Sequence, residues 1–184
     1  MIIMINGSFG SGKTTTAQML QPLIPNSMIY DPEEVGYMLR KIITEDVYFE
    51  EELTDDFQDI ELWRILAVKT AQELFNRYKK HLIVPMTIYK AVNFEYIYNG
   101  FRSIDREVFH FCLLASEDTI KKRIEKRGNT YDAWYQQHIK AGVATFKENR
   151  FQEHIETDHR ETEEIVEIIL RKTSGSFDKP VHHT

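Results

Sequence analysis

Short apolar runs alternate along this chain with longer segments whose apolar residues recur every three or four positions. The short runs are rich in Ile, Val, Leu and Phe and are bounded by glycine, proline or polar residues, which is typical of buried strands. We predict strands over residues 2–5, 27–30, 82–86, 107–114 and 152–157, and helices over 12–21, 32–43, 58–79, 116–127 and 161–171. This alternation predicts an α/β fold, in which helices cover both faces of a parallel sheet.

The clearest helix covers residues 58–79, because its apolar positions form one continuous stripe that should face the core. This stripe consists of Ile60, Trp63, Ala67, Ala71, Leu74 and Tyr78. Residues 91–104 fit either a helix or irregular structure. Capping residues mark the starts of three helices. Asp31 precedes Pro32 at the start of the helix over 32–43, and Ser116 begins the helix over 116–127. Asp158 and Glu161 have the spacing of a capping box before the helix over 161–171.

The chain has 184 residues, with 23 Lys and Arg against 29 Asp and Glu, and a formal net charge of −6. This length predicts one domain over residues 1–172, and the polar end predicts a disordered tail over 173–184. The acidic balance argues against a broadly basic surface for nucleic acid or membranes, although a local basic cleft is allowed. We therefore expect no nucleic-acid partner, and we leave monomer and homodimer open.

The remaining composition points to the cytoplasm. Cys112 is the single cysteine and lies in an apolar run, so we interpret it as a buried structural thiol. No apolar stretch approaches the ~20 residues that span a bilayer, and the first residues lack the basic region of a signal peptide. The seven histidines show no spacing suited to a closed metal site.

The strongest motif lies between the first predicted strand and the first predicted helix. Gly7-Ser8-Phe9-Gly10-Ser11-Gly12-Lys13-Thr14 matches the Walker A phosphate loop, G-x-x-x-x-G-K-[ST], without a mismatch. Glycines let backbone N–H groups turn toward an anion, and the helix N-terminus adds partial positive charge. Lys13 should reach the β- and γ-phosphates, and the Thr14 hydroxyl should bind Mg²⁺. We predict an ATP and Mg²⁺ site over residues 7–15, Thr15 included.

The class of phosphate-loop protein follows by exclusion. Signalling GTPases read guanine with an Asn-Lys-x-Asp segment, which this chain lacks, and larger ATPases need more residues. The layout of a small kinase remains. Asp31 and Glu33 follow the second strand and place a carboxylate across the cleft from the phosphate loop. Asp31 could accept a proton from a substrate hydroxyl or hold Mg²⁺ through water, or it could only cap its helix.

Arg123 and Arg127 lie four residues apart on one predicted helix face. Their cations could stack on a base and neutralise the transferred phosphoryl group, or they could be solvated residues at a helix end. Polar, aromatic residues follow over about 128–149, and they suit a lid that closes and excludes water. Within it, Thr130 to Tyr135 could clamp a base or sugar, or close a small apolar cluster.

Several segments together resemble the tunicamycin-resistance proteins. They are Met1 to Thr14, Tyr30-Asp31-Pro32-Glu33, Asp55-Asp56-Phe57-Gln58 with Leu62-Trp63-Arg64, Ile83 to Ile88, and Glu153 to Asp158. The layout is more distantly similar to shikimate, gluconate and nucleoside monophosphate kinases.

The resemblance implies a P-loop kinase fold with a five-stranded parallel sheet, ATP and Mg²⁺, a helical acceptor region over about 31–80 and a closing lid. It also implies that a loop near Thr157 contacts the base, and that a nucleoside antibiotic is handled by binding or phosphorylation. Many small kinases end the third strand with a carboxylate that supports Mg²⁺, whereas this chain has Pro85-Met86-Thr87 there. That departure shifts the role to Asp31 and leaves Thr87 as a neutral substitute.

The acceptor should lie over residues 31–64 and near Thr87. Arg40 and Arg64 are available cations, or alternatively surface residues in ion pairs. The rings of Tyr37, Phe57 and Trp63 could stack on a ligand, although Trp63 also lies on the predicted core stripe.

Our leading hypothesis is an ATP-dependent kinase with a small hydroxyl acceptor, with Lys13, Asp31, Arg123 and Arg127 as its catalytic residues. A nucleoside-type antibiotic such as tunicamycin is one candidate acceptor. One alternative is a gluconate-, shikimate- or nucleoside monophosphate-type kinase. The other is a protein that binds a drug in an ATP-dependent manner without turnover.

Overall fold

A computed structural model describes residues 1–128, 139, 142–151 and 153–177 of the chain. Five parallel strands form one sheet in the order β2-β3-β1-β4-β5. The strands are β1 (Ile2–Gly7), β2 (Ser27–Ile29), β3 (His81–Pro85), β4 (Val108–Leu114) and β5 (His154–Glu156). The helices are α1 (Lys13–Leu20), α2 (Glu33–Ile42), α3 (Glu61–Tyr78), α4 (Ala91–Ile104), α5 (Glu117–Lys126) and α7 (Thr162–Thr173). Short 3₁₀ segments are η1 (Gln21–Leu23), η2 (Glu50–Glu52), η3 (Phe57–Asp59) and η4 (Asn149–Phe151).

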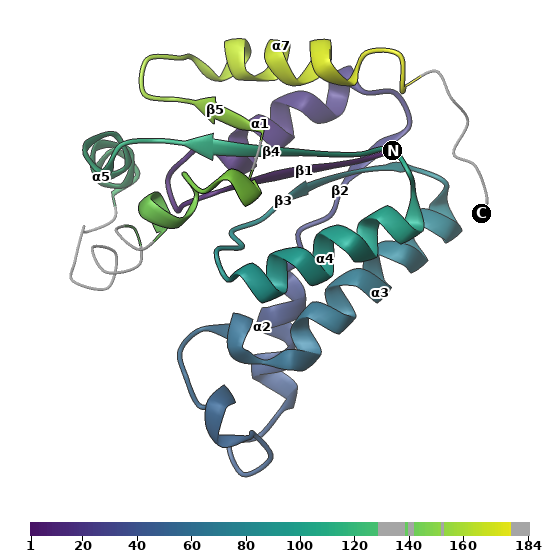
Figure 1. Ribbon diagram of the computed structural model, residues 1–184, viewed down its shortest axis with the longest axis vertical. Coiled ribbons are helices and arrows are strands. Elements are labelled where there is room, and N and C mark those ends of the chain that lie inside the picture. The colour runs from purple at the N-terminus through teal and green to yellow at the C-terminus, as the bar shows by residue number, and fades with distance from the viewer. Residues whose placement is uncertain (129–138, 140–141, 152, 178–184) are drawn as a thin grey trace.

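Helices cover both faces of this sheet, which confirms the predicted architecture. Figure 1 shows α1 and α7 over one face and α3 and α4 over the other. The central strand serves both layers, because its side chains alternate between the faces. Ile2 and Met4 pack with the cluster under α3 and α4, whereas Ile3 and Ile5 pack with the cluster under α1 and α7. Burial on both faces explains why β1 is a continuous apolar run.

Helix α3 differs in detail from its predicted form. Its buried residues are Trp63, Ala67, Ala71 and Phe75, whereas Tyr78 is 57% exposed. The predicted stripe was therefore wrong in its last turn, because apolar spacing alone cannot choose between Leu74, Phe75 and Tyr78. The helix also begins later than predicted, since residues 57–59 form the 3₁₀ segment η3.

Two predicted helix caps also differ. Helix α2 begins at Glu33 with Pro32 as the cap residue, and Asp31 Oδ1 accepts the Glu33 N–H at 2.9 Å. Before α7 the capping box consists of Glu161 and Glu164. Asp158 instead accepts the backbone N–H of Ser116 at 2.7 Å, so it ties the end of β5 to the start of α5.

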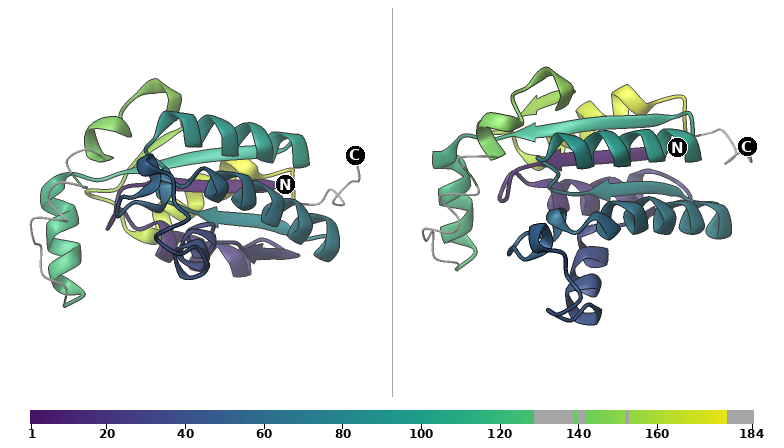
Figure 2. Two further views of the ribbon diagram at one scale, coloured as in Figure 1. Left: turned by 90° about the horizontal axis from the view of Figure 1, so that it is seen from below. Right: turned by 60° about the horizontal axis from the view of Figure 1, so that its bottom comes forward.

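Part of the predicted acceptor region projects from the sheet. Figures 1 and 2 show α2, η2 and η3 extending away from the strands, beyond α3. Most of the predicted lid, including residues 129–138 and 140–141, lies outside the described residues. So do residues 178–184 of the predicted tail, whereas Phe177 packs against the cluster under α1 and α7. No helix among the described residues is long and apolar enough to cross a membrane.

Candidate active site

The phosphate loop links β1 to α1 through glycines that no other residue can replace without strain. Gly12 is the N-cap of α1 and has φ +103°, in the left-handed region. A Cβ on Gly7 would lie 2.6 Å from the carbonyl oxygen of Leu113 and 2.7 Å from Ser11 Oγ. The loop can therefore turn tightly and present the first N–H groups of α1 to an anion.

Lys13 follows this loop and is only 8% exposed. Its Nζ donates a hydrogen bond to the carbonyl oxygen of Ser8 at 2.9 Å. Burial lowers the pKa of Lys13, and the carboxylates of Glu33 and Asp31 partly oppose that shift. Lys13 is therefore a buried cation whose hydrogen bond is to the backbone of the loop, and its binding to a phosphate stays a prediction.

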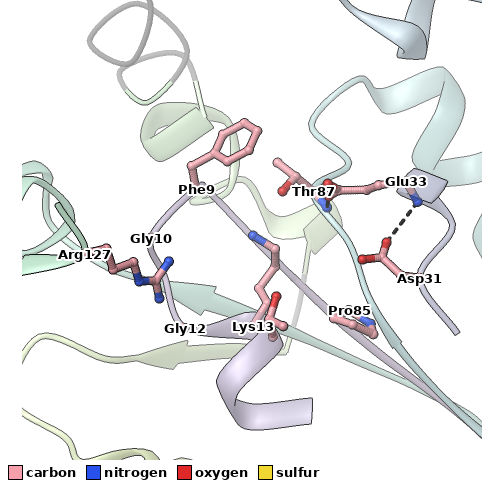
Figure 3. Close-up of a pocket in the computed structure, with 10 residues that line it drawn as sticks. Phe9, Gly10, Gly12, Lys13, Asp31, Glu33, Pro85, Thr87 and Arg127 are labelled. Carbon is pink, nitrogen blue, oxygen red and sulfur yellow. Dashed lines mark hydrogen bonds between the residues drawn. The ribbon is translucent and has the colours of Figure 1, made fainter. Parts of the chain in front are cut away.

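Lys13 points into a cavity of about 150 Å³, which we call the phosphate cavity. Figure 3 shows Arg127 on one side of the Lys13 side chain, with Asp31, Glu33 and Thr87 on the other. The cations and the carboxylates therefore line opposite walls. Such an arrangement can neutralise a phosphate chain on one side and take up a proton on the other.

Asp31 shows features of both roles that its position in the sequence left open. Its Oδ1 is engaged by the Glu33 N–H, as a helix-capping group would be. Burial, followed by the nearby charge of Glu33, raises the pKa of Asp31 to about 6. The side chain still lines the phosphate cavity, so capping its helix does not remove it from the site.

The sequence placed Glu33 beside Asp31 across the cleft, but it did not reveal that Glu33 binds the segment after β3. Its Oε1 accepts the backbone N–H of Thr87 at 2.8 Å, across 54 positions of the chain. The Glu33 carboxylate therefore lies next to the segment after β3, although residues 81–90 contain no Asp or Glu of their own. The only sequence signal was its place two residues after Asp31.

The donor atoms of this cavity fit Mg²⁺. Mg²⁺ is usually held by one or two carboxylates together with waters and substrate phosphates, and not by an all-protein cage. Thr14 is exposed on the first turn of α1, and Asp31 and Glu33 provide the carboxylates. Burial and, second, the charge of Glu33 raise the pKa of Asp31, and a divalent cation held by these carboxylates would favour its ionised form. Among the described residues, no group of three or more His, Cys, Asp or Glu could hold a metal alone.

A second cavity, of about 400 Å³, lies on the other side of the loop, between α5 and the start of α7. We call it the base-side cavity. Its lining includes Ser11, Gly12 and Thr15 of the phosphate loop and α1. It is also rich in cations, namely Arg123, Lys126, Arg127 and Arg160. Arg127 lines both cavities, so it is the described cation that links them.

Arg123 is held by protein oxygens. Its Nη1 donates to the carbonyl oxygens of Gly10 and Ser11 at 3.3 and 3.2 Å and to Thr157 Oγ1 at 3.1 Å. Its Nη2 donates to the Thr157 carbonyl oxygen at 2.9 Å. Arg123 thus ties the phosphate loop to the end of β5, and it does not line the phosphate cavity. Contacts of Arg123 and Thr157 with nucleotide stay predictions.

A third cavity, of about 130 Å³, adjoins the phosphate cavity, and we call it the acceptor cavity. Phe9, Glu33 and Thr87 line both of them. The rings of Tyr37, Phe57 and Tyr89 and the polar groups of Asp55, Asp56 and Gln58 complete its lining. A ligand here would lie directly against the phosphate cavity.

The two arginines predicted to contact the acceptor lie elsewhere. Arg40 donates to the Thr54 carbonyl oxygen at 2.5 Å and lies over the Tyr48 ring at 5.5 Å. Neither it nor Arg64 lines the described part of the phosphate or acceptor cavity.

Arg64 forms an ion pair with Glu61 and lies 5.6 Å from the ring centroid of Tyr96. Trp63 is fully buried, and its Nε1 donates to the Pro32 carbonyl oxygen at 2.9 Å. The structure therefore supports a place for Trp63 in the core and not a stacking surface for a ligand. Cys112 is likewise buried, and burial raises the pKa of its thiol to about 12.

Comparison with known proteins adds a family and a set of structural relatives. The AAA_18 family model, described as an AAA domain, matches residues 3–141. No curated protein matches the chain. The structure of the Deinococcus radiodurans tunicamycin resistance protein is similar over 94% of each chain, with 26% identity and a TM-score of 0.74. The resemblance noted in the sequence is thereby confirmed.

Kinases of the same fold are more distant. A sugar kinase from Janibacter sp. HTCC2649 matches with 18% identity and a TM-score of 0.65, over 97% of this chain and 98% of that one. A gluconokinase from Sinorhizobium meliloti 1021 matches with 16% identity and a TM-score of 0.62, over 92% of this chain and 89% of that one. These likenesses show the fold, which is that of P-loop kinases.

Proposed function

The chain belongs to the AAA_18 family of AAA domains, and from this premise we propose that it is an ATP-dependent small-molecule kinase with a hydroxyl acceptor. The observation that carries the proposal is the pair of adjoining cavities that share Glu33, Thr87 and Phe9. One contains the phosphate loop and its cations, and the other lies where an acceptor would meet the terminal phosphate. Two joined sites suit transfer between two ligands better than hydrolysis of one.

On the nucleotide side, the chain supplies positive charge and orientation. Lys13, Arg127 and the N-terminus of α1 would bind the phosphate chain and stabilise the charge that develops during transfer. Arg123 would act by holding the phosphate loop in shape. Bound MgATP supplies the phosphoryl group, with Thr14 and Asp31 as the residues that would hold the metal.

On the acceptor side, the carboxylates receive the proton. The acceptor oxygen forms a bond to the γ-phosphorus as the bond from that phosphorus to the β,γ-bridging oxygen breaks. The hydroxyl proton passes to Asp31 or Glu33, and ADP leaves with its terminal phosphate ionised. Without metal, burial and the charge of Glu33 raise the pKa of Asp31 to about 6, so it holds a proton more readily than an ordinary aspartate; where Asp31 holds Mg²⁺, Glu33 would take the proton instead.

A nucleoside-type antibiotic is the acceptor we would test first. The support is the similarity to a tunicamycin resistance protein over nearly the whole chain. Tunicamycin, uridine and other nucleosides are therefore the first compounds to compare.

Single-turnover transfer of labelled γ-phosphate tests the proposal. Excess protein is mixed with labelled ATP, Mg²⁺ and each candidate acceptor, and the label is followed into the acceptor. We expect a phosphorylated product that disappears in Lys13→Ala, whose circular dichroism spectrum should match that of the wild type. Tight acceptor binding without labelled product would instead support ATP-dependent binding without turnover.

A further inference from the structure

The walls of the acceptor cavity carry carboxylates and no basic side chain among the described residues. Glu33, Asp55 and Asp56 line it, together with three aromatic rings and Gln58. Arg40 and Arg64, the two arginines predicted to contact the acceptor, bind residues that do not line it. The cavity therefore presents negative charge and hydrogen-bond acceptors to its ligand.

The charge of Asp56 is largely balanced, whereas that of Asp55 is not. Asp56 Oδ1 accepts the Gln58 N–H at 2.9 Å, and Oδ2 accepts the Tyr89 hydroxyl and lies 3.1 Å from Lys90 Nζ. Asp55 is exposed and has no ion pair with the described residues. Asp55 thus supplies negative charge that no described cation pairs with, whereas the charge of Glu33 also acts on Lys13 in the adjoining phosphate cavity.

Gln58 provides an independent sign of a ligand. Its side chain is only 6% exposed, and its Nε2 donates to the Thr87 carbonyl oxygen at 3.2 Å. Its Oε1 is buried and accepts no hydrogen bond from the described residues. A buried acceptor without a donor is costly, and a donor group on a ligand in this cavity would relieve that cost.

The aromatic wall is fixed in place. The Phe57 ring lies 5.6 Å from Tyr37 in an edge-on arrangement and 5.2 Å from the fully buried Trp63. Such rings can pack against the apolar face of a base or a sugar.

We propose that the acceptor is a hydroxyl compound without an anionic group, either neutral or cationic. This inference rests on the proposed function and specifies its substrate class. Hydroxyl or ammonium donors of the ligand would bind Gln58 Oε1 and Asp55, and its apolar face would pack on Tyr37 and Phe57. A carboxylate or phosphate on the ligand would face Asp55 without a counter-ion among the described residues, so sugar acids and nucleoside monophosphates should bind more weakly than their neutral counterparts.

Matched ligands of different charge test the proposal. Glucosamine, glucose and gluconate form one set, and uridine with uridine 5′-monophosphate forms another. Each is titrated into the full chain by calorimetry, in the presence of Mg²⁺ and a saturating non-hydrolysable ATP analogue that blocks the nucleotide site. We expect a neutral or cationic member of at least one set to bind at least tenfold more tightly than its anionic counterpart.

A charge reversal at the cavity mouth provides the second arm. In Asp55→Lys, the ratio of the affinity for the neutral or cationic ligand to that for the anionic ligand should fall by about tenfold, because a negative side chain becomes positive. Glu51→Lys is the matched control, since Glu51 is exposed in the same region and lines neither cavity. It changes the net charge equally and should leave the preference as it is.

Different results would overturn the acceptor class and the proposed kinase function. Tighter binding of gluconate or uridine 5′-monophosphate than of its neutral counterpart would overturn the acceptor class, and so would no binding by any member while the ATP analogue binds. An equal response of Asp55→Lys and Glu51→Lys would also overturn it. Failure of the ATP analogue to bind would overturn the proposed function, and the acceptor class with it.

Discussion

Asp31 is a single residue at which folding and function make opposite demands. Its pKa of about 6 in the folded chain compares with about 3.9 for an unperturbed aspartate. The folded chain thus binds this proton more tightly than the unfolded chain. The stability that this group contributes is fully present below about pH 4 and is lost as the pH rises through about 6.

Asp31→Asn should therefore stabilise the free protein at high pH and reduce its activity. Asparagine keeps an oxygen for the Glu33 N–H and removes the charge. We expect the free energy of unfolding to rise by about 1 kcal/mol at about pH 8, discounted for partial exposure, and to change little at about pH 4. Urea unfolding at both pH values, without nucleotide or metal, measures this.

The turnover of Asp31→Asn should fall by ~10² or more, with little change in ATP affinity. A variant that keeps full turnover would leave Asp31 as a helix cap only.

The two arginines of the predicted pair should respond differently to the same change. Arg123→Lys keeps the charge and loses the planar fork that bonds to Gly10, Ser11 and Thr157. We expect the free energy of unfolding to fall by about 1–2 kcal/mol and nucleotide affinity to fall by about tenfold, because the loop loses its tie to β5. Arg127→Lys should instead lower the single-turnover rate with little effect on unfolding. Equal effects of the two variants on unfolding would contradict the assignment of Arg123 to holding the phosphate loop and of Arg127 to phosphoryl transfer.

At the scale of elements, the position of α2 against η3 shapes the acceptor cavity. A Cβ on Gly36 of α2 would lie 2.5 Å from Cγ of Phe57. Gly36→Ala should therefore displace the Phe57 ring and weaken acceptor binding by about tenfold, with nucleotide affinity unchanged. Calorimetry with the matched ligands measures both affinities.

Gly100 in α4 offers a control for this prediction. A Cβ there would lie 2.6 Å from Val68 Cγ2, so Gly100→Ala also forces two helices apart. The contact lies between α3 and α4, outside the acceptor cavity. Gly100→Ala should lower stability by about 1–3 kcal/mol and spare acceptor binding. If both variants weakened acceptor binding equally, the effect would belong to general destabilisation.

The elements themselves were predictable because their signals are local. Apolar runs, the phosphate loop and the Ser116 cap each depend on neighbouring residues, and the structure has them within a few positions. The acceptor cavity was not predictable in the same way. Its central bonds join Glu33 to Thr87 and Gln58 to Thr87, across 54 and 29 positions, and no local pattern specifies such contacts. The 3₁₀ segment η3, which turns Gln58 toward Thr87, was predicted as part of α3.

At the scale of the whole molecule, an acidic chain contains cavities of opposite character. The base-side cavity is rich in arginine and lysine, whereas the acceptor cavity has carboxylates, and the phosphate cavity between them has both. A net charge of −6 therefore describes the chain and not its sites. Charge alone would draw the phosphates of a nucleotide toward the arginine-rich side, so Lys13 and the N-terminus of α1 would have to hold the terminal phosphate near the carboxylates of α2.

Nucleotide binding should increase the stability of the whole fold. A ligand at 100 times its Kd adds about 2.7 kcal/mol to the free energy of unfolding, because it binds the folded state alone. At about 2–4 °C per kcal/mol for a chain of this size, the ATP analogue with Mg²⁺ should raise Tm by about 5–10 °C. Lys13→Ala should show no such rise at the same concentration, because no other described lysine lines the phosphate cavity. Calorimetric melting of both proteins with and without the analogue measures the difference. An equal rise in Lys13→Ala would mean that the analogue binds away from the phosphate loop.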